Sequence, residues 1–354
     1  MSNGPFAVCL EHKMSSVFEK QLQEIADELR NPFNGQNDVD FRNILDFMVK
    51  MWRDDQKLKE TCTINSIVFG SGGHGIRLCS DNKYDVMMEI QFPSYEKINV
   101  RKDQDRPGIC HLNFQNVPCS KFVLDNLLTD ASELKREDVH AWMEAILDKA
   151  HGATVRGRRE IYMLRYKRRN NCHTIHAISS AREFFIDFAP AVKIISNGSR
   201  CQALPKAAPG PKRSKATTFL MIAAEYELSL LEKTSKAAKD AILLMQALCI
   251  AKDLPKIRNY HLVTTVILLH HSKEINPEST LTTVFLALLL DLWDGMDDEY
   301  ICYFCYEDLS LISNFTKAEL TEYATVLKSA MRTLSTYSHR KKLAAGSCRS
   351  YFFK

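Results

Sequence analysis

A glycine-serine pair and a following aspartate are the residues whose types and spacing best fit phosphoryl-transfer chemistry. Gly70 and Ser71 follow the apolar pair Val68 and Phe69, and Asp85 lies in an alternating stretch farther along the chain. Glycine lets a backbone turn approach a phosphate closely, and carboxylates bind the divalent cations that clamp it. The pattern therefore predicts a nucleotide-binding turn followed by a strand that carries a metal-binding acid.

That strand lacks a second acid at the required spacing. Two carboxylates two residues apart on a strand share one face and can hold a pair of divalent cations. The position two residues before Asp85 is Lys83, and the position two residues after it is Met87. Glu89 shares the face but lies roughly 13 Å along the strand, so it cannot substitute without a bulge. Placing Lys83 where a carboxylate is expected changes the local charge by two units. One charge pair at ~4 Å is worth ~4 kcal/mol at an effective dielectric constant of 20.

Two side-chain orientations are open for Lys83. In the site, its ammonium could contact phosphate directly and support nucleotide binding without turnover. Turned to solvent, it would leave one metal for Asp85 and a further acid. The best candidate for that acid is Asp187, because it is isolated in the apolar run 184–191. Its simpler interpretation is a turn carboxylate ahead of Pro190.

The chain resembles the family of cyclic GMP-AMP synthase, which includes the cyclic GMP-AMP synthase-like receptors and the Mab developmental proteins. The resemblance runs through most of the chain. Its blocks are the helix before the turn, Gly70-Ser71 with the Asp85 strand, the Ile186-Asp187 strand, Asn259-Tyr260-His261-Leu262 with Thr264-Thr265, and Tyr303-Phe304 with Asp308-Leu309. It implies an α/β (α+β) bilobed nucleotidyltransferase fold, with a mixed-sheet core, a long N-terminal spine helix and a C-terminal helical bundle.

The resemblance also implies an activity and its site residues. The family joins ATP and GTP into a cyclic dinucleotide after double-stranded nucleic acid binds, as a cytoplasmic innate immune receptor. Asp85 and Asp187 would be catalytic and would hold Mg or Mn, if the site is active. The implied nucleotide-binding residues are Ser71, Lys83, Lys239 and Tyr260.

Some expected nucleotide contacts are missing or open to two interpretations. Tyr260 matches an aromatic platform for a nucleobase, worth roughly 1 to 3 kcal/mol per base, or it is a packing residue at a helix start. The family has an arginine on the helix after the linker, and Leu220 takes that position here. Its lysine that reaches the triphosphate is replaced by Gln246 when Lys239 is aligned. Together with Lys83, these departures favour impaired catalysis. The alternative is an inactive, Mab-like regulatory protein that binds nucleotides or nucleic acid.

A basic segment is the second functional signal. Only Glu160 opposes it. Its members are Arg156, Arg158, Arg159, Arg165, Lys167, Arg168 and Arg169. Such a cluster can neutralise phosphates without reading sequence, and A-form RNA is recognised by shape. The alternative is an ordinary solvated surface. The resemblance implies double-stranded RNA or DNA, and RNA is favoured because the zinc-insertion cluster of the vertebrate DNA sensor has no counterpart.

No zinc site is predicted. Cys302-x-x-Cys305 and Cys172-His173-x-x-His176 each lack a complete set of four ligands. Eleven scattered cysteines argue against a disulfide scaffold and for a reducing compartment. We expect no signal peptide, because the first residues lack a basic and an apolar region. The apolar stretches fall short of the roughly 20 residues that a membrane helix requires, so we expect a cytoplasmic protein without membrane contact.

Length and composition predict two lobes. The chain has 354 residues, 45% hydrophobic and 25% charged, with a net charge of +4. We expect a nucleotidyltransferase core over 1–200, a basic, Pro-rich connector over 201–217, a helical lobe over 218–338 and a disordered basic tail over 339–354.

Periodicity predicts the elements within these divisions. In the core we expect helices over 14–30, 38–59 and 138–150, with Asp38 as the N-cap of the second. Expected strands cover 66–69, 84–92, 109–114, 159–166, 173–178 and the Asp187 segment. In the helical lobe we expect helices over 218–232, 237–251, 260–271, 281–293 and 317–334.

Overall fold

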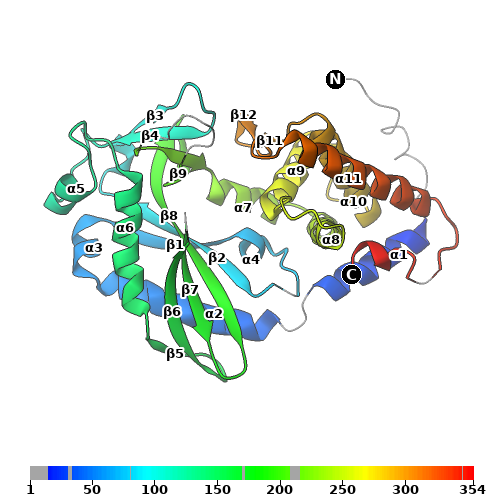
Figure 1. Ribbon diagram of the computed structural model, residues 1–354, viewed down its shortest axis with the longest axis horizontal. Helices are drawn as coiled ribbons and strands as arrows, with labels where there is room; N and C mark the ends of the chain where they lie inside the picture. Colours follow the sequence, from blue (N-terminus) through cyan, green and yellow to red (C-terminus); the bar gives the residue numbers. More distant parts are fainter. Residues whose placement is uncertain (1–14, 31–33, 80, 170–171, 208–215, 345) are drawn as a thin grey trace. The chain divides into compact units, whose positions relative to one another are not determined.

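A computed structural model of the chain describes residues 15–30, 34–79, 81–169, 172–207, 216–344 and 346–354. The chain divides into two units. The first, here called the sheet unit, comprises residues 32–74 and 80–229, and the second, the helical unit, comprises 1–31, 75–79 and 230–354. Figure 1 labels the helices and strands of both.

The sheet unit is built on one large mixed sheet, as expected from the sequence. Its strands are β1 Thr63–Phe69, β2 Lys83–Gln91, β3 Asn99–Lys102, β4 Ile109–Asn113, β5 Thr154–Arg156, β6 Ile161–Arg169, β7 Cys172–Ile178, β8 Glu183–Ser196, β9 Ser199–Leu204 and β10 Phe219–Ile222. The main path runs β3-β4-β10-β9-β8-β7-β6-β5, and β2 joins it by pairing with β8 and β1. The β2–β8 ladder is parallel, whereas β6–β7 and β7–β8 are antiparallel.

One face of this sheet is covered by the long helix α2, Asn34–Asp54. Phe41 of α2 stacks on Tyr84 of β2 with ring centroids 3.9 Å apart, and Trp52 meets Phe188 of β8 edge-on at 5.5 Å. Side chains alternate along a strand, so the neighbours of Tyr84 and Phe188 must point to the other face. The residues of β2 and β8 that face α2 are therefore core residues, and the alternate residues on the opposite face are available for a site.

Shorter helices complete the sheet unit. They are α3 Gln56–Thr61, α4 Gly70–His74, α5 Lys121–Asn126, α6 Arg136–Leu147 and α7 Ala224–Glu232, with single turns η2 Tyr95–Lys97 and η3 Asp148–Ala150. The α7 helix crosses the division between the units, which falls after Ser229.

The helix expected over 38–59 is two helices. The α2 helix begins at Asn34, so Asp38 is not its N-cap, and its carboxylate instead accepts a hydrogen bond of 2.9 Å from the Tyr84 hydroxyl. The break comes at Asp55, whose carboxylate accepts from the backbone N–H of Leu58 and caps α3. An aspartate inside an apolar periodicity can thus end one helix and start the next.

The segment expected as connector and helix contains two strands. Residues 201–204 belong to β9, where Ala203 is fully buried. The run 219–222 pairs with both β9 and β4, so the helix expected over 218–232 begins only at Ala224. By periodicity a short apolar run fits a strand or a helix equally well. Here the run forms a strand because it can pair with β4 on one side and β9 on the other. Residues 208–215 of the expected connector lie outside the described residues.

The helical unit packs its helices around one apolar helix. Its elements are α1 Ser16–Leu29, α8 Lys236–Ala251, α9 Asn259–His271, α10 Leu281–Asp297 and α11 Lys317–Ser338, with the hairpin β11 Cys302–Tyr303 and β12 Tyr306–Ser310 and the turn η4 Arg349–Tyr351. The α10 helix contacts α1, α8, α9 and α11 and is buried on nearly every side. Among the described helices, none combines the length and the apolar run needed to cross a bilayer.

The tail expected to be disordered is packed on this core. Cys348 and Phe352 are buried, and the ring of Phe352 lies 5.7 Å from that of Phe285. Arg349 forms an ion pair with Glu28 of α1. The basic residues 340–342 suggested a solvated end, but the apolar side chains beyond them provide the burial that orders the segment.

A buried aspartate ties α2 to the turn between β5 and β6. Asp40 is fully buried; its carboxylate accepts from the Tyr162 hydroxyl at 2.8 Å and from the backbone N–H of Arg158 at 2.6 Å. A Cβ added at Gly157 would lie 2.5 Å from the same carboxylate. The turn that carries Arg158 therefore depends on this contact.

Replacing Asp40 by alanine is expected to destabilise the protein by roughly 2 to 4 kcal/mol. The buried Tyr162 hydroxyl and the part-buried backbone N–H of Arg158 lose their acceptor, and an unsatisfied buried group costs about 1 to 3 kcal/mol. Urea unfolding followed by circular dichroism measures the change. Asp46→Ala serves as the control, because Asp46 is exposed on the same helix. Equal effects of the two substitutions would refute the role of Asp40.

Two buried histidines connect α6 to β7. The Nε2–H of His140 donates to the carbonyl oxygen of Pro205 at 2.8 Å, so its Nδ1 accepts from His173 Nε2 at 3.2 Å. The Nδ1 of His173 then accepts from the Tyr166 hydroxyl at 2.7 Å. Burial is the largest influence on both rings; it lowers the pKa of His140 and lowers that of His173 to about 3.

This chain of hydrogen bonds predicts acid sensitivity. Below pH ~6.5 His173 is protonated in the unfolded chain but stays neutral in the folded protein. The contribution of His173 to the free energy of unfolding is therefore fully present above pH ~6.5 and declines as the pH falls to about 3. The decline is expected to reach about 1.4 kcal/mol per pH unit. His173→Gln should flatten the dependence of thermal unfolding on pH, whereas His271→Gln, at an exposed site, should leave it unchanged. Identical pH profiles for all three proteins would contradict this account.

Candidate functional site

The two predicted acids lie side by side on the face of the sheet opposite α2. The parallel ladder between β2 and β8 places Asp85 directly opposite Asp187. Thr174 of β7 donates its hydroxyl to Asp187 Oδ1 at 2.6 Å, and the Cys172 thiol lies 3.6 Å from Oδ2. Asp187 is thus a buried, hydrogen-bonded carboxylate facing Asp85 and not a turn residue ahead of Pro190.

Lys83 points into this pair of carboxylates. Its Nζ lies 2.7 Å from Asp187 Oδ2 and 3.4 Å from Asp85 Oδ1. The side chains of Lys83 and Asp85 are 45% and 42% exposed, whereas that of Asp187 is 9% exposed, so the ammonium and Asp85 lie at the mouth of the site with the Asp187 carboxylate beneath them. Of the two orientations that the sequence left open, the structure has the inward one.

The charges of the three residues are coupled. Burial is the largest single influence on Lys83 and disfavours its charge, but the Asp85 and Asp187 carboxylates outweigh it and raise the pKa of the ammonium. Burial likewise raises the pKa of Asp85, with Asp187 adding to the effect and Lys83 opposing it. The lysine is therefore a charged counter-ion to both acids.

The glycine-serine turn is shaped by the same acids. Gly70 has φ +62°, and a Cβ added there would lie 2.5 Å from Asp85 Oδ2, so only glycine fits. The Ser71 hydroxyl donates to Asp81 Oδ2 at 3.0 Å, while Asp81 Oδ1 accepts from the backbone N–H of Lys83 at 3.0 Å. Asp81 and Thr174 are the site residues that sequence reasoning missed. The spacing of two between Asp81 and Lys83, which repeats that of Lys83 and Asp85, was the available signal for the first.

These residues do not fit a pair of divalent cations. The carboxylates that face each other are two, and an ammonium already contacts both. Within the described ranges, no cluster of three or more histidine, cysteine, aspartate or glutamate side chains could hold a metal. Glu89 cannot supply the missing acid, because it is buried and accepts hydrogen bonds from Gln202 at 2.9 Å and Lys193 at 3.3 Å.

The other predicted nucleotide contacts belong to the helical unit. Tyr260 opens α9 with 42% of its surface exposed, and its ring lies 4.1 Å from that of His261. Lys239 is half-buried on α8. Gln246 is buried and donates to the carbonyl oxygen of Ile76 at 3.0 Å, which is a packing role. Leu220 lies on β10, so the expectation that it occupies a helix is wrong.

The basic segment does not form one surface. Its exposed strand residues, Arg156, Arg165, Lys167 and Arg169, share the face of Lys83 because they are paired across β5, β6 and β7. Arg168 points to the opposite face and pairs with Glu137 at 2.8 Å and Glu144 at 3.3 Å. Arg158 and Arg159 are exposed in the turn between β5 and β6.

The cysteine-containing motifs are also separated by strand alternation. His173 is fully buried, whereas Cys172 and His176 are half-buried on the face of Asp187. Cys302 and Cys305 lie in the β11–β12 hairpin, and no cysteine in the described part of the chain forms a disulfide bond.

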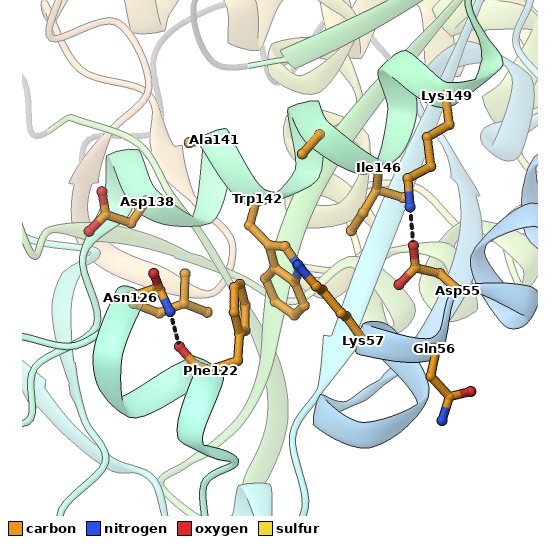
Figure 2. Close-up of a pocket in the computed structure, with 12 residues that line it drawn as sticks. Asp55, Gln56, Lys57, Phe122, Asn126, Asp138, Ala141, Trp142, Ile146 and Lys149 are labelled. Carbon is orange, nitrogen blue, oxygen red and sulfur yellow. Dashed lines mark hydrogen bonds and ion pairs between the residues drawn. The ribbon is translucent and has the colours of Figure 1, made fainter.

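A separate pocket lies in the sheet unit between α3, α5 and α6 (Figure 2). It has a volume of about 580 Å³, and Phe122 and Trp142 line it. Its acids are already paired, Asp55 with Lys149 and Asp138 with Lys135. None of the predicted site residues lines this pocket, so it is distinct from the carboxylate site.

Comparison with known proteins agrees with this architecture. Residues 73–237 match the Mab-21 protein nucleotidyltransferase domain. The chain is 23% identical over 292 residues to a cyclic GMP-AMP synthase-like receptor of Lucilia cuprina, covering 75% of this chain and 78% of that protein. It is 24% identical over 238 residues to cyclic GMP-AMP synthase-like receptor 1 of Drosophila melanogaster, covering 58% and 62% of the two chains. With the Drosophila erecta receptor 1 it shares 22% identity over 189 residues, 50% of this chain and 41% of the other.

The chain spans less than two thirds of those two Drosophila proteins. The matched domain nevertheless contains β2, β8 and both aspartates of the site. The α/β fold agrees with the domain match, and Gly70 and Ser71 precede the matched residues. The match to the Mab-21 nucleotidyltransferase domain and the similarity to cyclic GMP-AMP synthase-like receptors together support the Mab and cyclic GMP-AMP synthase-like family.

Proposed function

We propose that this protein binds nucleotides and nucleic acid on a nucleotidyltransferase fold whose metal-dependent transfer activity is impaired. The observation that carries the proposal is the position of Lys83, with its ammonium within 3.4 Å of Asp85 and 2.7 Å of Asp187. A divalent cation on these acids would have to displace or repel that ammonium.

The physical argument concerns the charge that transfer requires. Phosphoryl transfer depends almost entirely on positioning and on stabilising the charge that develops on phosphate. A lysine supplies a single charge and no coordination positions, whereas Mg or Mn held by Asp85 and Asp187 would supply two charges and Lewis-acid chemistry. An ammonium still binds phosphate as a point charge. The site thus favours holding a nucleotide over converting it.

The partners proposed are those of the family. In the sheet unit, Ser71 and Lys83 would contact ATP or GTP, and Lys239 and Tyr260 are the nucleotide-binding residues that the resemblance implies in the helical unit. Exposed basic residues would meet nucleic acid. The resemblance implies double-stranded RNA or DNA, with RNA favoured, and a role as a cytoplasmic innate immune receptor. The curated relatives named cyclic GMP-AMP synthase-like receptors support this direction.

A second candidate function is the active cyclic dinucleotide synthase. Asp85 and Asp187 remain in register, and the Lys83 side chain is 45% exposed on a long, flexible stem. If that stem swings to solvent, the two acids could hold one Mg or Mn. Both candidates make different predictions for metal binding and for product formation.

Removing the ammonium is expected to create metal affinity. In Lys83→Met the two carboxylates lose their counter-ion, so Mn²⁺ should raise the melting temperature of the variant and leave that of the unmodified protein unchanged. At a tenfold excess of Mn²⁺ over the dissociation constant, the stabilisation would be about 1.4 kcal/mol. Lys102→Met, an exposed lysine on β3, is the matched control. Equal stabilisation of the unmodified protein and Lys83→Met by Mn²⁺ would refute the proposal.

The activity test uses ATP, GTP, Mg²⁺ or Mn²⁺, and double-stranded RNA or DNA. Lys83→Glu restores an acid two residues before Asp85, and we expect cyclic product from this variant and none from the unmodified protein. The double variant Lys83→Glu, Asp187→Asn should lose the product again. Chromatography with mass detection measures it. Product from the unmodified protein would overturn the proposal in favour of the active enzyme; no product from either protein, with nucleic-acid binding confirmed separately, would support binding alone.

A further inference from the structure

A straight row of side chains crosses four strands on the face of the carboxylate site. The ladders pair Arg165 of β6 with His176 of β7, His176 with Phe185 of β8, and Phe185 with Lys83 of β2. Directly paired residues point to the same face. Three steps of about 4.8 Å make the row ~14 Å long between the Cα atoms of its ends.

The centre of the row is an aromatic platform. The rings of His176 and Phe185 are stacked, with centroids 4.3 Å apart and planes inclined by 18°. The Arg169 guanidinium lies 5.6 Å from the centroid of Phe185. Both rings are half-buried, so the stack is fixed by the sheet and still presents surface.

The cationic side chains around this platform lack carboxylate partners among the described residues. Arg165, Lys167 and Arg169 are exposed and form no ion pair with a carboxylate among the residues that the structure describes, in contrast to Arg168 on the other face. Lys167 lies beside Thr174, in the row of Asp187 and Asp85.

The acids on the same face all have polar partners. Glu183 accepts a hydrogen bond of 3.0 Å from His176, and Lys83 supplies one positive charge to the two site aspartates. The cations without a carboxylate partner among the described residues, Arg165, Lys167 and Arg169, lie on β6 beside the aromatic pair.

We infer that this face binds a single-stranded oligonucleotide. A base would stack on the Phe185–His176 pair, and the phosphates would lie against Arg165, Lys167, Arg169 and Lys83. The inference rests on the proposed binding of nucleic acid and changes its partner from a duplex to a single strand. It assigns Phe185 and His176 a role in base contact.

The aromatic pair is what favours a single strand. A duplex presents phosphates to a basic surface but keeps its base faces inside the helix, so Phe185 would gain nothing. An unpaired strand offers both phosphates and base faces, and proteins that bind it combine a basic groove with stacking side chains. The interleaved cations and rings of this face have that composition.

Fluorescence anisotropy with a labelled 12-nucleotide single strand, and with a duplex of the same length, tests the inference in buffer with EDTA and without nucleoside triphosphates. The single strand is expected to bind more tightly than the duplex. Phe185→Leu, which retains an apolar side chain, should weaken single-strand binding by roughly tenfold through loss of stacking. The triple variant Arg165→Ser, Lys167→Ser, Arg169→Ser should lower the slope of log affinity against log salt by about 2.

The matched control is Lys97→Ser, Lys102→Ser, which removes two exposed charges elsewhere on the sheet unit and should leave single-strand affinity nearly unchanged. Thermal unfolding of each variant confirms that the sheet remains folded. Duplex binding as tight as single-strand binding would overturn the inference, and so would an unaltered affinity in Phe185→Leu. Because no metal or triphosphate is present, these outcomes leave the test of the Lys83 site untouched.

Discussion

The parallel pairing of β2 with β8 is the constraint on which the site depends. It sets Asp85 opposite Asp187 and Phe185 opposite Lys83, so the alternation of two strands decides which side chains meet. The pairing itself is held from the other face, where Phe41 and Trp52 of α2 pack on Tyr84 and Phe188. A shift of one residue would exchange the two sets and bury the charges. The same strand register therefore determines both which residues pack in the core and which residues form the site.

Sequence reasoning could propose the strand residues of the candidate site because their signal is local. Alternation in β2 and the isolated acid in an apolar run identify Asp85 and Asp187 without knowledge of the fold. The direction of the Lys83 side chain is different in kind. A long stem reaches either solvent or the acids, and the choice depends on β8, which is distant in sequence. The same applies to Gln246, whose contact with Ile76 joins two distant segments.

The errors in the fold prediction also have specific causes. Asp55 interrupts an apolar periodicity that continues on both sides, so one helix was expected where two exist. The run 219–222 adopts a strand because β4 and β9 leave a place for it. At the C-terminus, Cys348 and Phe352 are too few to produce a periodic pattern, yet they are buried. In each case a contact between distant segments outweighed the local pattern.

A metal ion in such a site is a dissociable ligand, whereas the ammonium of Lys83 is attached to the chain. Its local concentration is set by the length of its own stem and does not follow the supply of magnesium in the surroundings. The positive charge at this site therefore persists when free cations are scarce, and no chelator can remove it. An anion that binds Lys83 would therefore meet a positive charge without any need for a bound divalent cation.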